Sequence, residues 1–125
     1  MRLSITSTFE IAAGHHLPYH QGKCHRPHGH NYRLEFTRYG EPQEGTGPRA
    51  GMVEDFADFD GAIKAVLGLI DDDGLDHRSL NDFLPNPTAE LLALWLLEKL
   101  SGVDKVVVWE TGRHCATAER THADQ

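Results

Sequence analysis

The sequence predicts an α+β domain in which an antiparallel sheet is covered by two helices. In the first third of the chain, apolar and polar residues alternate with period two, which is typical of half-buried strands. In the middle of the chain, apolar residues recur at every third or fourth position, which is typical of helices with one buried face. The expected order is strand, strand, helix, helix, strand, strand. Strands grouped in pairs around two helices favour an antiparallel sheet.

The first two strands are expected before residue 40. The first would place on one face the apolar residues Leu3, Ile5, Phe9 and Ile11. The second, residues 30–37, would place together His30, Tyr32, Leu34 and Phe36. The following residues 40–51 are rich in glycine and proline and predict a loop.

The first helix is expected over residues 56–70, with Asp55 or Asp58 as its N-cap, and the acidic turn 71–74 should end it. The second should begin near Pro87, with Asn86 or Thr88 as N-cap. Residues 91–100 are so rich in leucine that this helix is either deeply buried or shared with a partner.

The last part of the chain predicts the second pair of strands. Ser101 and Gly102 should stop the second helix, and a β-rich run covers residues 103–109. A fourth strand is expected over residues 114–121, and we expect residues 122–125 to fray.

Length and charge restrict the class of protein. The 125 residues fit one domain, 1–125, and are few for a deep substrate pocket without neighbouring subunits. The formal net charge of −7 argues against a general grip on nucleic acid, which needs clustered Lys and Arg. The chain has no apolar run of the ~18 residues that a membrane span needs, it begins without a signal-peptide pattern, and its two cysteines cannot form a dense disulfide framework. We therefore expect a soluble cytoplasmic protein.

The most informative segment is residues 24–30, with the sequence CHRPHGH. On a strand, His28 and His30 would point to the same face and suit two ligands of one metal ion. A hairpin-like pairing would bring the end of the first strand nearby, so His15 or His16 is the natural third ligand. Three histidines leave the fourth position of tetrahedral zinc open, as in catalytic sites. The alternative is a polar strand face without metal.

Cys24 allows two interpretations. It could be the fourth zinc ligand, which would make the site structural. It could instead be a reactive thiolate, because a nearby cation lowers the pKa of a thiol. Spacing alone does not separate the two.

Two further places carry candidate chemistry. Asp76 could orient His77 and raise its basicity, although a polar loop is the simpler interpretation. Glu110 ends a strongly apolar run, where a buried carboxylate would need donors such as two adjacent N–H groups of a ligand. The simpler interpretation is a strand-end residue that faces water.

These residues together resemble a known family, that of 6-pyruvoyl- and 6-carboxy-tetrahydropterin synthases. The resemblance runs through nearly the whole chain, and it rests on the Cys-x-x-x-His-Gly-His motif and on five further segments in the same order, residues 11–18, 51–56, 75–81, 86–90 and 110–111. It implies the tunnelling fold, a four-stranded antiparallel sheet with two helices on one face. It also implies a homo-oligomeric ring, with a hexamer favoured and active sites between subunits.

The resemblance implies roles for individual residues. The zinc ligands of the family correspond to His15, His28 and His30. Its catalytic residues correspond to Cys24, Asp76 and His77, which favours the thiolate interpretation of Cys24. The resemblance places substrate binding at Glu110, the pterin anchor, and at Thr111 and Thr88. His16 stands where the family usually has arginine and Ile11 where it usually has phenylalanine, so His16 could compete with His15 for the metal.

The implied activity is that of a zinc-dependent lyase. Its substrate would be 7,8-dihydroneopterin triphosphate, and its products 6-carboxy-5,6,7,8-tetrahydropterin, acetaldehyde and triphosphate, a step of queuosine biosynthesis. The spacing between Cys24 and His28 resembles the bacterial carboxy-forming branch. The alternatives are a pyruvoyl-forming enzyme and a zinc-binding protein without catalysis. The cations available for the triphosphate are Lys23, Arg26, Arg78 and Arg113.

Overall fold

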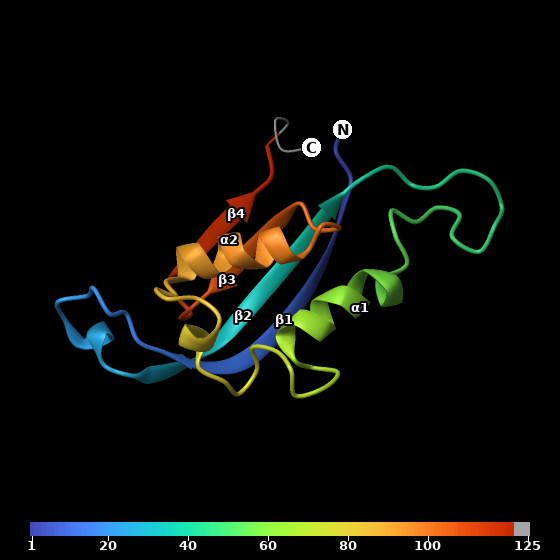
Figure 1. Ribbon diagram of the computed structural model, residues 1–125. Coiled ribbons are helices and arrows are strands. Elements are labelled where there is room, and N and C mark those ends of the chain that lie inside the picture. Colours follow the sequence, from blue (N-terminus) through green and yellow to red (C-terminus); the bar gives the residue numbers. More distant parts are fainter. Residues whose placement is uncertain (122–125) are drawn as a thin grey trace.

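The computed structural model describes residues 1–121, and it confirms the predicted α+β class and element order (Figure 1). One antiparallel sheet has the strand order β1-β2-β3-β4. Its strands are β1 (Ser4–His15), β2 (His28–Tyr39), β3 (Lys105–Trp109) and β4 (Cys115–Glu119). Two helices lie between β2 and β3 in the sequence, α1 (Phe56–Leu67) and α2 (Ala89–Lys99). The expected fraying of residues 122–125 lies outside the described residues.

Pairing across the sheet gathers the apolar side chains on one face. Ile11 is opposite Tyr32, Leu34 is opposite Val108, and Val106 lies between Phe36 and Ala118. All of these side chains are buried, and the buried faces of both helices pack into the same core. Because side chains on a strand alternate between faces, this register also decides which face every polar residue near the strand ends occupies.

Helix α1 begins and ends at residues suited to those positions. The Asp55 side chain accepts a hydrogen bond from the Ala57 N–H at 2.9 Å, so Asp55 rather than Asp58 is the N-cap. The helix ends at Leu67 because Gly68 adopts a left-handed conformation with φ 77°. Glycine has no side chain, so this conformation has little steric cost there. The predicted extension to residue 70 is therefore wrong, and Ile70 is 64% exposed beyond the cap.

Helix α2 is buried on one side and exposed on the other. Thr88 is the N-cap, since its hydroxyl oxygen accepts the Leu91 N–H at 3.1 Å. At the other end the Arg120 guanidinium donates to the Leu97 carbonyl at 2.6 Å. The buried residues of α2 include Leu92, Ala93, Leu96 and Leu97, whereas Leu94 is about half exposed. Neither helix has the length and apolarity needed to cross a membrane, and the described residues contain no other candidate.

Residues 75–81, which we call the edge segment, follow α1 and run beside the free edge of β1. The His77 N–H donates to the Ala12 carbonyl at 2.6 Å, and the Gly14 N–H donates to the Arg78 carbonyl at 3.1 Å. The Ala12 N–H donates to Asp76 Oδ1 at 3.0 Å. The edge segment thereby satisfies main-chain groups that a sheet edge would leave unpaired. It also brings Asp76 and His77 to the end of β1 that carries His15.

Candidate metal centre

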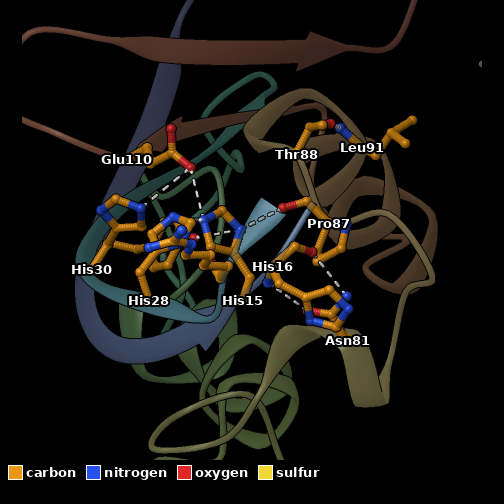
Figure 2. A network of polar contacts seen from close by, with 11 residues as sticks. His15, His16, His28, His30, Asn81, Pro87, Thr88, Leu91 and Glu110 are labelled. Carbon is orange, nitrogen blue, oxygen red and sulfur yellow. Dashed lines mark hydrogen bonds and ion pairs between the residues drawn. The ribbon is translucent and has the colours of Figure 1, made fainter. Parts of the chain in front are cut away.

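Three imidazoles converge where β1 ends and β2 begins. The antiparallel register pairs His15 with His28 and Ala13 with His30, so all three rings project from the face that carries Ile11 and Tyr32. One ring nitrogen from each histidine lies within 4.8 Å of the other two (Figure 2). The structure therefore brings together the three residues expected to bind the metal.

The main chain fixes the tautomer of two of these rings. His15 Nδ1 lies 2.8 Å from the Pro87 carbonyl oxygen, and His28 Nδ1 lies 2.7 Å from the Arg26 carbonyl oxygen. A carbonyl can only accept, so each Nδ1 carries the proton and donates it. Both Nε2 atoms are then left with a lone pair, and they face each other at 2.9 Å. Two lone pairs at that distance repel unless a cation or a shared proton lies between them.

The third ring shows the same need for a cation. His30 Nε2 is buried and has no hydrogen-bond partner, although buried polar atoms are normally paired. Three imidazole nitrogens are a donor set that zinc accepts, and a carbonyl on the far nitrogen is the usual way in which proteins orient a metal-binding histidine. The residues present therefore fit a divalent metal ion.

Burial favours the neutral, metal-binding form of two of these imidazoles, His15 and His30. Desolvation lowers the pKa of His15 and of His30, and the nearby Glu110 carboxylate only partly opposes the shift. Burial likewise raises the pKa of Tyr32, whose hydroxyl lies 3.2 Å from His15 Nδ1. These shifts favour the neutral imidazole for His15 and His30 and the neutral phenol for Tyr32.

His16 is not part of this cluster among the described residues. Its main chain is held by the Asn81 side chain, which accepts the His16 N–H at 2.9 Å and donates to the His16 carbonyl at 3.0 Å (Figure 2). His16 follows the last residue of β1 and lines the same cavity as His15, but its ring nitrogens lie outside the cluster. Geometry thus favours His15 over His16 as the third ligand.

Cys24 is also outside the cluster, within the part of the chain that is described. It lies half-buried in the short 3₁₀ turn Lys23–His25, on the connection between β1 and β2. Its carbonyl accepts the Leu17 N–H at 2.7 Å. The Cys24 sulfur does not form a four-ligand site with the histidines of the same chain. The interpretation of a closed structural zinc site with Cys24 is therefore not supported.

Asp76 and His77 form the expected pair. His77 Nδ1 donates to Asp76 Oδ2 at 2.8 Å, and the other carboxylate oxygen accepts the Ala12 N–H. Burial alone would raise the pKa of Asp76, but these hydrogen bonds outweigh it and hold the pKa below its ordinary value. The His77 side chain is 80% exposed, and its main chain has a left-handed φ of 62°. The pair therefore presents an oriented imidazole at the surface of the single chain.

Glu110 lies closer to the histidines than its expected role suggests. Its Oε1 atom is 3.3 Å from His15 Nε2 and 3.6 Å from His30 Nε2. It also lines a cavity of about 360 Å³, together with Glu90, His114 and Cys115. The carboxylate therefore stands between the imidazole cluster and a space large enough for part of a ligand.

The two threonines have structural contacts of their own. Thr88 caps α2, and the Thr111 hydroxyl oxygen accepts the N–H groups of Arg113 and His114, each at 3.2 Å. The second set of bonds shapes the turn between β3 and β4. Neither contact tests the predicted role of these residues in substrate binding.

A cavity of about 650 Å³ adjoins the cluster. Its lining includes the three histidines of the cluster, His77 and Arg78. Of the four cations considered for a triphosphate, only Arg78 is among these lining residues. Arg78 also lies 4.0 Å from Asp73 and stacks over the Phe83 ring, so its position is partly fixed.

Comparison with known proteins agrees with this geometry. The model of the 6-pyruvoyl tetrahydropterin synthase family matches residues 4–121. A 6-carboxy-5,6,7,8-tetrahydropterin synthase of Synechocystis sp. is 38% identical over 93% of this chain and 90% of its own length. A dihydroneopterin monophosphate aldolase of Pyrococcus furiosus is 38% identical, but only over 58% of this chain and 54% of its own. Among solved structures, Caenorhabditis elegans 6-pyruvoyl tetrahydropterin synthase superposes with a TM-score of 0.80 at 27% identity and covers 97% of both chains.

Proposed function

Because the chain belongs to the 6-pyruvoyl tetrahydropterin synthase family and is an enzyme of that family, we propose that it is a zinc-dependent lyase acting on 7,8-dihydroneopterin triphosphate. With one water consumed, the products would be 6-carboxy-5,6,7,8-tetrahydropterin, acetaldehyde and triphosphate, as in a step of 7-deazaguanine (queuosine) biosynthesis. The observation that carries the metal part of the proposal is the convergence of one ring nitrogen each from His15, His28 and His30, with His30 Nε2 buried and without a hydrogen-bond partner. The Synechocystis relative, matched over most of both chains, supports the carboxy product.

The three histidines would hold zinc, which supplies Lewis acidity to oxygens of the substrate side chain. Cys24 as thiolate would take a proton from that side chain. His77, oriented by Asp76, would exchange a second proton. Each proton-transfer group is expected to contribute about 10²–10⁴-fold to the rate.

Recognition of the substrate would use groups on both sides of the cluster. Glu110 would accept two hydrogen bonds from the 2-amino group and ring N–H of the pterin. Thr88, at the N-cap of α2, and Thr111, directly after Glu110 in the chain, would add contacts to the substrate. Arg78 is the cation best placed to meet a phosphate, because it lines the same cavity as the histidines. No role for nucleic acid or a membrane is proposed.

We also propose that the active site is completed in a cytoplasmic homo-oligomer, with a hexamer favoured. Cys24 is absent from the lining of the cavity that contains the histidines, and the His77 side chain is largely exposed in the single chain. Leu91 and Leu94 leave an apolar strip of α2 exposed, which a neighbouring subunit would cover. The oligomeric mass in solution, measured by analytical ultracentrifugation, tests this part.

The decisive experiment is incubation of zinc-loaded protein with 7,8-dihydroneopterin triphosphate, followed by identification of the pterin and of the released aldehyde. We expect 6-carboxy-tetrahydropterin together with acetaldehyde. A pyruvoyl pterin without aldehyde would assign the chain to the other branch. Cys24→Ala should keep its zinc and lose turnover, and loss of zinc from this variant would contradict the role given to Cys24.

A further inference from the structure

The position of Glu110 poses a question that a pterin anchor alone does not answer. One of its carboxylate oxygens faces His15 and His30, and the other is turned away from them (Figure 2). Its backbone N–H donates to the His114 carbonyl at 3.2 Å, so the main chain at this point is fixed by the hairpin of β3 and β4. The side chain reaches into the cluster from a rigid strand end.

The distances suit atoms that share a metal ion better than atoms that share a proton. A hydrogen bond between a charged carboxylate and an imidazole N–H is normally ~2.7–2.9 Å long. The two contacts of Oε1 are longer, at 3.3 Å and 3.6 Å. In a tetrahedral zinc site with bonds of ~2.0–2.1 Å, neighbouring ligand atoms lie about 3.3–3.4 Å apart. Oε1 therefore lies near the separation expected between ligand atoms relative to His15 and His30, whereas Glu110 is outside the group of three nitrogens that lie within 4.8 Å of one another.

Charge balance favours the same arrangement. Three neutral imidazoles leave the full charge of a divalent ion in a site where the His15 side chain is only 1% exposed. Uncompensated charge in such surroundings is costly, and a coordinating carboxylate halves it. Among the described residues, Glu110 is the acid that contacts the His15 and His30 rings.

We propose that Glu110 is the fourth metal ligand while the site holds no substrate, and that it leaves the metal when a pterin enters the adjoining cavity. The identity of the entering ligand rests on the proposed function. The contact between Glu110 and the metal does not depend on turnover. The carboxylate would exchange the metal for the two N–H donors of the pterin. The coordination position then opens only when the substrate is in place, so the closed site excludes water and other oxygen ligands from the metal at rest.

The test replaces zinc with cobalt(II), whose visible spectrum reports the number and kind of ligands. Wild-type protein without pterin should show a four-coordinate spectrum. Glu110→Gln should change that spectrum and weaken cobalt binding by about 10–100-fold, the loss typical of outer-shell groups and a lower bound for a direct ligand. Glu90→Gln removes the same charge from the same cavity and should change neither. Circular dichroism checks that each variant is folded. Glu110→Asp keeps a shorter carboxylate, so its cobalt affinity should lie between those of the wild type and Glu110→Gln.

Two results with these variants would overturn the proposal. One is a Glu110→Gln variant with the cobalt spectrum and affinity of the wild type. The other is an equal loss in Glu110→Gln and Glu90→Gln, which would reduce the effect to net charge. A separate arm adds unsubstituted pterin, which has no side-chain oxygens, to cobalt-loaded wild type. Binding by calorimetry with a spectral shift supports displacement of Glu110, whereas binding without a shift contradicts it. Turnover is not measured in any arm, so failure here is distinct from failure of the proposed reaction.

Discussion

At the scale of single residues, the side chain of Asn81 holds the main chain next to His15. Its amide accepts from and donates to the two main-chain groups of His16, at 2.9 Å and 3.0 Å. A planar amide that makes both bonds fixes the orientation of this peptide segment, and with it the direction of the neighbouring His15 side chain. Asn81 is therefore a positioning residue for the metal centre, without contact to the ring nitrogens.

We expect Asn81→Ala to weaken zinc binding by about 10–100-fold, as for other outer-shell groups. The reason is that His16 loses both partners and the end of β1 becomes free to turn. Competition with a chromophoric chelator measures the affinity. Asn81→Asp should retain part of it, because the carboxylate still accepts the His16 N–H. Asn86→Ala is the matched control, since no side-chain hydrogen bond is recorded for Asn86, and unchanged affinity in Asn81→Ala would remove the positioning role.

The three histidines were predictable from the sequence, whereas Asn81 as their support was not. The spacing of His28 and His30 on a strand predicted their common face, whereas the residues alone left His15 and His16 open as the third ligand and the resemblance indicated His15. The contact between Asn81 and His16 joins residues that are 65 positions apart. It depends on the path of the edge segment after α1, which no local pattern specifies.

At the scale of elements, the end of α1 and the start of the edge segment are joined through two glycines. A Cβ built on Gly74 would lie 2.1 Å from the Gly68 nitrogen, a distance that no packed structure tolerates. Gly68 in turn needs its left-handed φ to cap the helix. The sequence pattern predicted a longer helix because Ile70 continued the apolar spacing, but the backbone contact at Gly68 and Gly74 overrides it.

Gly74→Ala should therefore lower the free energy of unfolding by about 1–3 kcal/mol or more, the range for side chains forced into filled space. Gly61→Ala provides the matched control within α1, where a Cβ would meet nothing within 4 Å. Replacement of a mid-helix glycine should raise stability by about 0.5–1 kcal/mol. Urea denaturation of the metal-free proteins measures both. Equal effects of the two substitutions would show that the close backbone approach is unimportant.

At the scale of the whole molecule, the candidate groups do not all meet within the part of one chain that the structure describes. The imidazole cluster and Glu110 are together, Asp76 and His77 face the solvent beside it, and Cys24 lies apart on the connection between β1 and β2. Sequence patterns predicted which residues are candidates. They did not predict which subunit would supply each of them, because that depends on how folded chains would associate.

Complementation between inactive variants would reveal a site shared between subunits. We expect Cys24→Ala and His77→Ala each to lose about 10²–10⁴-fold in turnover. Co-refolded mixtures should regain a measurable part of the activity, because some sites then receive an intact Cys24 and an intact His77 from different chains. The control mixture of His15→Ala with His28→Ala should stay inactive, since both residues belong to the imidazole cluster of one chain. Recovery in the control, or none in the first mixture, would contradict the division.

The ladder between β1 and β2 is unbroken from Ser4 opposite Tyr39 to His15 opposite His28. The backbone positions that carry the imidazoles are thus set by twelve paired positions, and His16 and Arg26 at the two ends of the connection help to orient the rings. Insertions or deletions within residues 17–25 can accumulate over evolutionary time without displacing the donor atoms. This connection is accordingly the part of the architecture most open to diversification, and Cys24, which lies on it, is the group whose location would drift first.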